Sequence, residues 1–285
     1  MSKSNLNGRL LEYYIVDTIL KSYPNCIMDN QTISDQKRDG SRIHELDQHL
    51  ISRFTKSSEI VLGWLSSKTE ITRVSRLSDI SGIKGDVTDI IVFGKNNTSL
   101  NLSIKNNHRA VKHQRPGSLI QQLGFPKGSQ KDLTYRRELS NIYQNFHLKI
   151  QKQTPVPKLF RDVEILKYPF IYRPVCSLVS ETINSFSKEL NIPNQYQSFL
   201  IGNTNFYKVI VNDGHVNILE FSEIIKSTHM ISTCSENYVY VDFTNGIKVN
   251  MRLHTASSRI TDNISLKFDS QLDDDDHIPT KTYSF

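Results

Sequence analysis

Asp89, Ser103 and Lys105 are the residues of this 285-residue chain whose types and spacing best suit chemistry on a phosphodiester. Asp89 stands at the head of a short apolar run, and Lys105 ends a second run that begins at Leu100. The residues between the two runs are rich in Gly, Asn and Ser. This pattern predicts two antiparallel strands joined by a turn.

In the symmetric register of such a hairpin, Asp89 lies opposite Lys105 and Ile91 lies opposite Ser103. Residues directly opposite each other share a face of the sheet. Asp89, Ser103 and Lys105 are therefore expected to converge, while the apolar residues 100, 102 and 104 face the other side. A slip of one residue would break this convergence.

These residue types suit the hydrolysis of a phosphodiester. A divalent cation polarises the phosphoryl oxygen, lowers the pKa of the attacking water and stabilises the leaving oxygen. Asp89 suits Mg²⁺, which takes few protein ligands and keeps several waters. Lys105 can hold the scissile phosphate or orient the water. The alternative is a hairpin in which Asp89 merely starts a strand and Lys105 is solvated.

A basic segment surrounds Lys105. Between residues 90 and 131 there is no Asp or Glu, and the basic residues are Lys95, Lys105, His108, Arg109, Lys112, His113, Arg115, Lys127 and Lys131. A local field of one sign is expected where a polyanion binds, so double-stranded DNA is the predicted partner. The net charge of +6 and the pI of about 9.1 also favour an acidic partner. A solvated basic face is the alternative.

Three blocks of the sequence resemble a known family. Residues 85–92 (GDVTDIIV) and 102–116 (LSIKNNHRAVKHQRP) are similar to the HaeIII-like group of the PD-(D/E)xK type II restriction endonucleases. Residues 249–259 (VNMRLHTASSR) with 265–269 (SLKFD) resemble the C-terminal signature of the group, and residues 7–13 (NGRLLEY) resemble its first helix. The resemblance spans nearly the whole chain, and the central block is the most specific part.

The resemblance implies that Asp89 is the metal-binding aspartate and Lys105 the catalytic lysine. Ser103 takes the second acidic position, where a hydroxyl is a weak ligand for Mg²⁺, so a carboxylate elsewhere must compensate. Glu12, on a predicted buried helix over residues 6–20, and Asp86 are the candidates. Glu12 could instead be an exposed or capping residue, and Asp86 follows Gly85 as turn residues do.

Further residues are expected to contact DNA. His108 follows the catalytic lysine closely and could act as a general base or donate to a phosphate. The other candidates are Asn107, Arg109, Lys112, His113, Arg115, Arg252, His254 and Arg259. Arginine to guanine is the commonest direct readout, but the sequence does not separate base readers from phosphate contacts. The resemblance implies a palindrome of the GGCC type, which suggests a homodimer.

Other functional classes find little support in the sequence. There is no Gly-x-x-x-x-Gly-Lys-Ser/Thr loop, so nucleotide-driven translocation is not predicted. The three cysteines are widely spaced, which is typical of reduced thiols rather than a zinc site. With no signal-like or membrane-spanning segment, the protein is expected in the cytoplasm. Two alternatives stay open: a structure-directed repair or recombination nuclease, and a non-catalytic DNA-binding module.

The expected fold is α/β, with a PD-(D/E)xK restriction-endonuclease-like core in which helices flank a central mixed sheet. Residues 1–205 form the predicted catalytic core, whose N-terminal part is helical over 43–54 and 59–66 with a polar loop at 30–40. Residues 131–150 have helical spacing. Residues 206–272 are β-rich, with turns at Asp213-Gly214 and Asn245-Gly246. Residues 273–285 are expected to be a frayed acidic tail.

Overall fold

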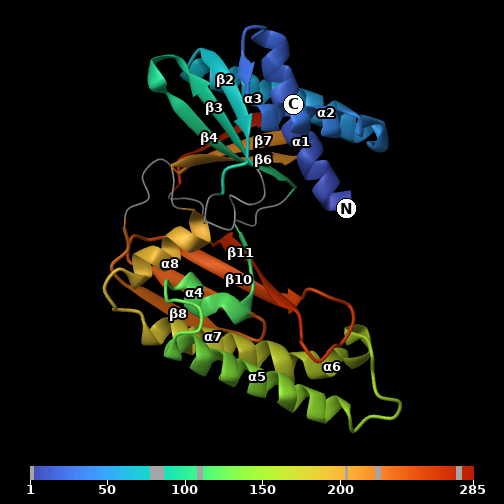
Figure 1. The fold of residues 1–285 in the computed structure, drawn as a ribbon, viewed down its shortest axis with the longest axis vertical. Helices are drawn as coiled ribbons and strands as arrows, with labels where there is room; N and C mark the ends of the chain where they lie inside the picture. The colour runs from blue at the N-terminus through green and yellow to red at the C-terminus, as the bar shows by residue number, and fades with distance from the viewer. Residues whose placement is uncertain (1–2, 78–86, 108–111, 203–204, 222–225, 274–277) are drawn as a thin grey trace. The chain divides into compact units, whose positions relative to one another are not determined.

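A computed structural model describes residues 3–77, 87–107, 112–202, 205–221, 226–273 and 278–285 (Figure 1). The chain forms two compact units, and each is discontinuous in sequence. The first unit consists of Met1–Arg109, Asn203–Ile224 and Ile278–Phe285, and the second of Ala110–Gly202 and Ile225–His277. This division differs from a boundary at residue 205, because hydrogen-bond pairing draws strands from three parts of the chain into one sheet.

The first unit is built on a seven-stranded mixed sheet. Its order is β1-β2-β3-β4-β6-β7-β12, with β4–β6 and β1–β2 parallel and the other pairs antiparallel. The strands are β1 (Ile27–Met28), β2 (Ile71–Arg76), β3 (Ile90–Gly94), β4 (Ser99–Asn106), β6 (Phe206–Asn212), β7 (His215–Phe221) and β12 (Thr280–Ser284). The predicted turn at Asp213-Gly214 joins β6 to β7, and Gly214 supplies its positive φ of 82°.

The last strand corrects the expectation of a frayed tail. β12 pairs with β7 from Thr280 to Ser284, and the Phe285 N–H donates to the Gly214 carbonyl at 3.0 Å. Alternation of short polar and aromatic residues is a weak strand signal, so β12 depends on the pairing edge that β7 offers. The acidic residues 274–276 lie outside the described residues.

Three helices cover the apolar face of this sheet. They are α1 (Lys3–Ser22), α2 (Asn30–Gly40) and α3 (Gln48–Lys68). The core between helices and sheet includes Leu10 and Ile15 of α1, Phe54 of α3, Leu102 of β4 and Val209 of β6. The predicted helix over 6–20 is therefore confirmed, and its apolar residues point into this core.

Two expectations for the N-terminal part were wrong. The stretch 30–40 is the helix α2 rather than a loop, because the Asp29 side chain caps it by accepting from the Thr32 N–H at 2.7 Å. The segments 43–54 and 59–66 are not separate elements, since α3 runs without a break from Gln48 and is capped by Asp47.

The second unit pairs a five-stranded antiparallel sheet with helices. The order is β5-β11-β10-β9-β8, with β5 (Lys112–Gln114), β8 (Met230–Cys234), β9 (Tyr238–Phe243), β10 (Lys248–Thr255) and β11 (Leu266–Leu272). The helices are α4 (Leu119–Gln122), α5 (Gln130–Ile150), α6 (Glu164–Lys167), α7 (Arg173–Ser185) and α8 (Ile192–Ile201). The predicted helix over 131–150 and the strands after 206 are confirmed.

Alternation along these strands buries one face of the second sheet. Val241 of β9, Met251 and Leu253 of β10, and Phe268 of β11 are buried, and α7 packs on β8 and β9 (Figure 1). The fold of the whole chain is mixed α/β, with a large mixed sheet flanked by helices, as expected. In the part of the chain that the structure describes, no helix is both long and apolar enough to cross a bilayer.

Candidate active site

The β3–β4 hairpin has a register two residues away from the symmetric one. Ile90 pairs with Leu102 and Val92 with Leu100, and Asp89, which precedes these pairs, donates its N–H to the Leu102 carbonyl at 2.8 Å. The difference arises because residues 94–98 alone make the connection, with Asn96 and Asn97 at a φ of 58°. A shift of two residues preserves the face of every side chain, so the predicted convergence survives.

Donors gather around one carboxylate oxygen of Asp89. Its Oδ2 accepts from the Ile104 backbone N–H at 2.6 Å, from Lys105 Nζ at 3.1 Å and from Ser103 Oγ at 3.4 Å. Asp89 and Lys105 keep 28% and 25% of their side-chain surface exposed, so solvent and solutes reach both. Ser103 is buried behind them. Three of the predicted residues thus form one cluster.

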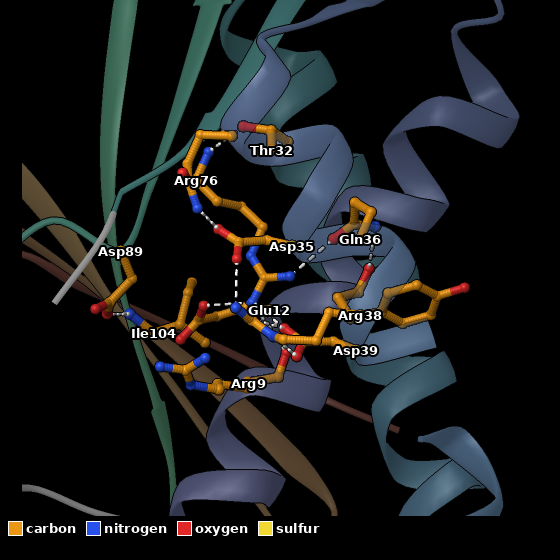
Figure 2. A network of polar contacts seen from close by, with 12 residues as sticks. Arg9, Glu12, Thr32, Asp35, Gln36, Arg38, Asp39, Arg76, Asp89 and Ile104 are labelled. Carbon is orange, nitrogen blue, oxygen red and sulfur yellow. Dashed lines mark hydrogen bonds and ion pairs between the residues drawn. The ribbon is translucent and has the colours of Figure 1, made fainter. Parts of the chain in front are cut away.

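Glu12 joins this cluster from helix α1. Its pKa is raised from the usual 4.5 to about 7: burial is the largest cause, the nearby charge of Asp89 also raises the pKa, and Arg76 and Lys105 lower it. Glu12 therefore lies within electrostatic range of both Asp89 and Lys105, although it is remote from them in sequence. Figure 2 shows the Glu12 and Asp89 side chains on neighbouring elements, α1 and the start of β3.

A buried arginine fixes the position of Glu12. Arg76, the last residue of β2, places Nη2 at 2.9 Å from Glu12 Oε2 and at 2.9 Å from Asp39 Oδ2. Its Nη1 donates to Gln36 Oε1 at 3.0 Å, and its backbone N–H donates to Thr32 Oγ1 at 2.8 Å (Figure 2). One guanidinium thereby ties α1 and α2 to the strand beside Asp89.

Asp39 is a second carboxylate that forms an ion pair with Arg76. Burial would raise the pKa of Asp39, but the hydrogen bond from Arg38 and the charge of Arg76 lower it below its usual range. Sequence reasoning missed both Arg76 and Asp39. The available signal was the alternating strand at 71–76 that ends in arginine, together with the helix at 30–40 that its polar composition concealed.

Lys208 is a second residue that sequence reasoning missed. It lies on β6 directly opposite Ser103 of β4 and is only 3% exposed. Residues paired in this way share a face, so a buried lysine stands in the same row of the sheet as Ser103 and Asp89. The signal was a lysine within the apolar run of residues 206–211.

The remaining candidates near Lys105 in sequence are only partly described by the structure. Asp86, His108 and Arg109 lie outside the described residues, as does the side chain of Lys112. Asn107 directly follows β4 with a φ of 52°, and its N–H donates to the Val211 carbonyl at 2.9 Å.

The candidates of the second unit gather around Asp269, a residue not singled out from the sequence. His113 Nδ1 lies 2.5 Å from its Oδ1, His254 Nε2 lies 2.8 Å from its Oδ2, and Arg252 Nη2 lies 3.8 Å from Oδ2. As expected, Arg252 and His254 project from one face of β10. Arg115 instead donates to Ser265 Oγ at 2.8 Å, and Arg259 is exposed in the connection between β10 and β11.

The donor set in the first unit suits a hard divalent cation. Asp89 and Glu12 offer carboxylate oxygens, and the contacts of Asp89 with Ser103, Ile104 and Lys105 all use its Oδ2. Among the described residues no cluster of three or more His, Cys, Asp or Glu side chains could hold a metal. A cation with two protein carboxylates and several waters is the pattern typical of Mg²⁺.

Comparison with known proteins identifies the family of this chain. The HaeIII restriction endonuclease family matches residues 62–228, a range that holds Asp89, Ser103, Lys105 and Lys208. The type II restriction enzyme HaeIII of Haemophilus aegyptius is 25% identical over an alignment that covers 95% of this chain and 94% of the relative. No solved structure matches the chain. Because the family matches more than half of its length, the chain belongs to the HaeIII restriction endonuclease family.

Proposed function

We propose that this protein is a Mg²⁺-dependent type II restriction endonuclease of the PD-(D/E)xK kind that hydrolyses phosphodiester bonds of double-stranded DNA. The observation that carries the proposal is the cluster of Asp89, Lys105 and Glu12 at the end of the β3–β4 hairpin. Two carboxylates and a lysine, with Asp89 and Lys105 partly exposed on the sheet and Glu12 on α1, are the groups that metal-assisted hydrolysis of a phosphodiester requires.

Each residue of the cluster has a separate task. Asp89 and Glu12 hold the cation, which when bound polarises the phosphoryl oxygen and lowers the pKa of the attacking water. Lys105 binds the scissile phosphate or orients the water as a compact cation. Ser103 is the neutral residue at the second acidic position, and Glu12 supplies the missing carboxylate. Asp86 remains an alternative for the metal and His108 for proton transfer.

The DNA itself is bound by basic and amide side chains that follow the catalytic lysine in sequence. We assign this role to Asn107, Arg109, Lys112, His113, Arg115, Arg252, His254 and Arg259. The name of the HaeIII relative motivates GGCC as the first target to examine. A palindromic target calls for a homodimer in which each subunit cuts one strand.

Cleavage of a sequenced plasmid with Mg²⁺ and with EDTA tests the proposal. We expect discrete metal-dependent fragments whose ends give the target site. Asp89→Ala and Lys105→Ala should abolish cleavage and keep much of the affinity for DNA, because the phosphate contacts elsewhere remain. Lys95→Ala is the matched control, since Lys95 is an exposed lysine of the same hairpin that pairs with Glu70.

The possible results separate the candidate functions. Undiminished cutting by Asp89→Ala or Lys105→Ala would contradict the site. A metal-dependent smear or cutting confined to branched substrates would indicate a structure-directed nuclease. Tight duplex binding without any cutting in Mg²⁺ or Mn²⁺ would indicate a DNA-binding module.

A further inference from the structure

The second unit leaves one side of its five-stranded sheet without a helix among the described residues. Its opposite side is the buried face that packs on α7. On the helix-free side, hydrogen-bonding and charged residues replace the apolar ones. They include His113 of β5, Lys267 and Asp269 of β11, Arg252 and His254 of β10 and Tyr238 of β9, and one exposed apolar residue, Ile231 of β8, lies on the same side. We call this side the polar sheet face.

Strand register places the functional groups of this face in rows. One row runs across four strands as His113, Asp269, Arg252 and Tyr238, each directly opposite the next. The neighbouring row is Gln271, Asn250, Tyr240 and Thr233. The rings of Tyr238 and Tyr240 stack between the rows at 5.9 Å. The face is thus an ordered array of side chains and not a random polar surface.

Asp269 organises the basic groups of the array. Besides His113, His254 and Arg252, it has Lys267 Nζ at 3.8 Å from its Oδ1. Its own side chain is 12% exposed, whereas Arg252 and His113 are 54% and 52% exposed. Burial would raise the pKa of Asp269, but the hydrogen bonds and charges of His254 and His113 lower it below its usual range, so the carboxylate stays charged.

The charges of the face are unevenly distributed. Asp242 lies opposite Lys248 and Asp273 accepts from Asn250, whereas Asp269 is shared among two basic side chains and two histidines. Around Asp269 one carboxylate therefore faces two permanent cations, and protonation of either histidine adds positive charge there. Positive charge concentrated at this part of the face complements a polyanion. Arginine, asparagine and glutamine are also the side chains that pair with guanine and adenine edges.

We propose that the polar sheet face reads duplex DNA, that Arg252 is a base-reading residue and that Asp269 is the positioning residue that aims it. The inference rests on the proposed function, which makes duplex DNA the substrate. β-Sheets bind the grooves of DNA with side chains of alternate residues, and a carboxylate that fixes an arginine lowers the entropy lost on binding. In the sequence, β5 of this sheet follows the strand of Lys105 after residues 107–111 only.

The test measures binding in the full-length Asp89→Ala background, so that cleavage does not interfere. The probes are a short labelled duplex with a central GGCC and a matched duplex with the same bases shuffled. Arg252→Ala should lower affinity for the target duplex by about tenfold to a hundredfold and leave affinity for the shuffled duplex nearly unchanged. Lys267→Ala should weaken both duplexes equally and reduce the salt slope by about one.

Asp269→Asn separates positioning from a structural role. If Asp269 aims Arg252, the variant loses discrimination between the two duplexes but binds the shuffled duplex at least as well as before, because a negative charge is gone. A merely structural role would weaken both duplexes together with a fall in thermal stability. Lys152→Ala and Lys188→Ala, at exposed lysines of the second unit outside this sheet, serve as controls.

Failure of this inference and failure of the proposed function give different results. If Arg252→Ala/Lys267→Ala binds both duplexes as tightly as the parent protein, the polar sheet face does not bind DNA, whatever the plasmid assay shows. If that double variant loses affinity for every duplex while the unmutated protein neither cuts nor discriminates, the face binds DNA but the restriction activity and the reading role of Arg252 are wrong. If plasmid cleavage identifies another target, the same comparison is made on that target.

Discussion

In the proposed site, Glu12 supplies the carboxylate that Ser103 lacks. A hydroxyl at the second acidic position is a weak ligand for Mg²⁺, whereas Glu12 brings a full carboxylate into range of Asp89 and Lys105. The two carboxylates repel each other, and burial adds to the cost of the second charge. Arg76 offsets part of this cost through its contact at 2.9 Å. A bound cation would offset the rest, which is why such a pair suits a metal site.

Moving the second carboxylate from residue 12 to residue 103 tests the roles proposed for Glu12 and Ser103. Glu12→Gln should lower the cleavage rate by about 10²–10³, the loss typical of one removed electrostatic group. Ser103→Asp in the Glu12→Gln background should recover part of the rate, because it returns a carboxylate beside Asp89 from the adjacent strand. Ser103→Asn is the matched control and should recover none. Recovery by Asn, or full activity of Glu12→Gln, would show that Glu12 is not a ligand.

The titration of Glu12 also predicts how stability depends on pH. Its pKa is about 7 in the folded protein and near 4.5 in the unfolded chain, so the folded state holds the extra proton between these values. The stabilisation is complete below the unfolded pKa and is lost as pH rises toward and through about 7, on the order of 3 kcal/mol. Urea denaturation of the metal-free protein at pH of about 5 and about 8 measures this loss. Glu12→Gln should remove most of the difference.

Among the secondary-structure elements, β4 is held in place at both ends. Its start follows the tight connection at 94–98, and its end is fixed by Arg53 of α3, which is 6% exposed. Arg53 Nη2 donates to Asn106 Oδ1 at 2.6 Å, and its Nη1 contacts Asp213 in the β6–β7 turn. One buried guanidinium therefore connects a helix, the strand that carries Lys105 and a turn.

Truncation of this arginine should loosen β4 next to Lys105. Arg53→Ala leaves the Asn106 amide without its partner and should lower the free energy of unfolding by about 2–3 kcal/mol. Cleavage should fall mainly in kcat, since Lys105 loses its fixed position. Arg42→Ala is the control, because Arg42 pairs with the neighbouring Glu45 near the surface, far from β4 in sequence, and its loss should leave both properties unchanged. Equal effects of the two substitutions would contradict the coupling.

Considered as a whole molecule, the first unit depends on segments from both ends of the chain. α1 supplies Glu12 near the N-terminus, and β12 closes the sheet edge at β7 near the C-terminus. An uncovered edge strand exposes unpaired N–H and C=O groups and promotes association. The C-terminal segment is therefore part of the fold that carries the catalytic hairpin.

Removal of the residues after Asp273 tests this dependence. The truncated protein lacks β12 and should melt roughly 5 °C or more below the full chain and aggregate more readily. Lys281→Ala changes an exposed side chain of β12 but keeps its backbone pairing, so it should melt like the unchanged protein. An unaltered melting temperature of the truncated chain would mean that β12 adds nothing to the first unit.

The sequence alone was sufficient to find Asp89, Ser103 and Lys105, because a hairpin is a local structure and alternation fixes which side chains share a face. It also predicted α1, α5 and the strands β3, β4, β6, β9 and β10, since their apolar periodicity is strong. It could not give the register of the hairpin, which depended on the small number of residues in the turn. It also missed α2, because the polar residues of this helix are typical of a loop, and only their contacts with Arg76 explain why they are buried.

Only the tertiary structure brought Glu12 to Asp89, placed Lys208 opposite Ser103 and gathered His113, Arg252 and His254 around Asp269. Local patterns report which face a residue occupies within its own element. Which elements become neighbours is decided by long-range packing and strand pairing, and ion pairs between distant segments follow from that choice. The residue types therefore predicted the proposed chemistry, whereas the fold determined which residues contact one another.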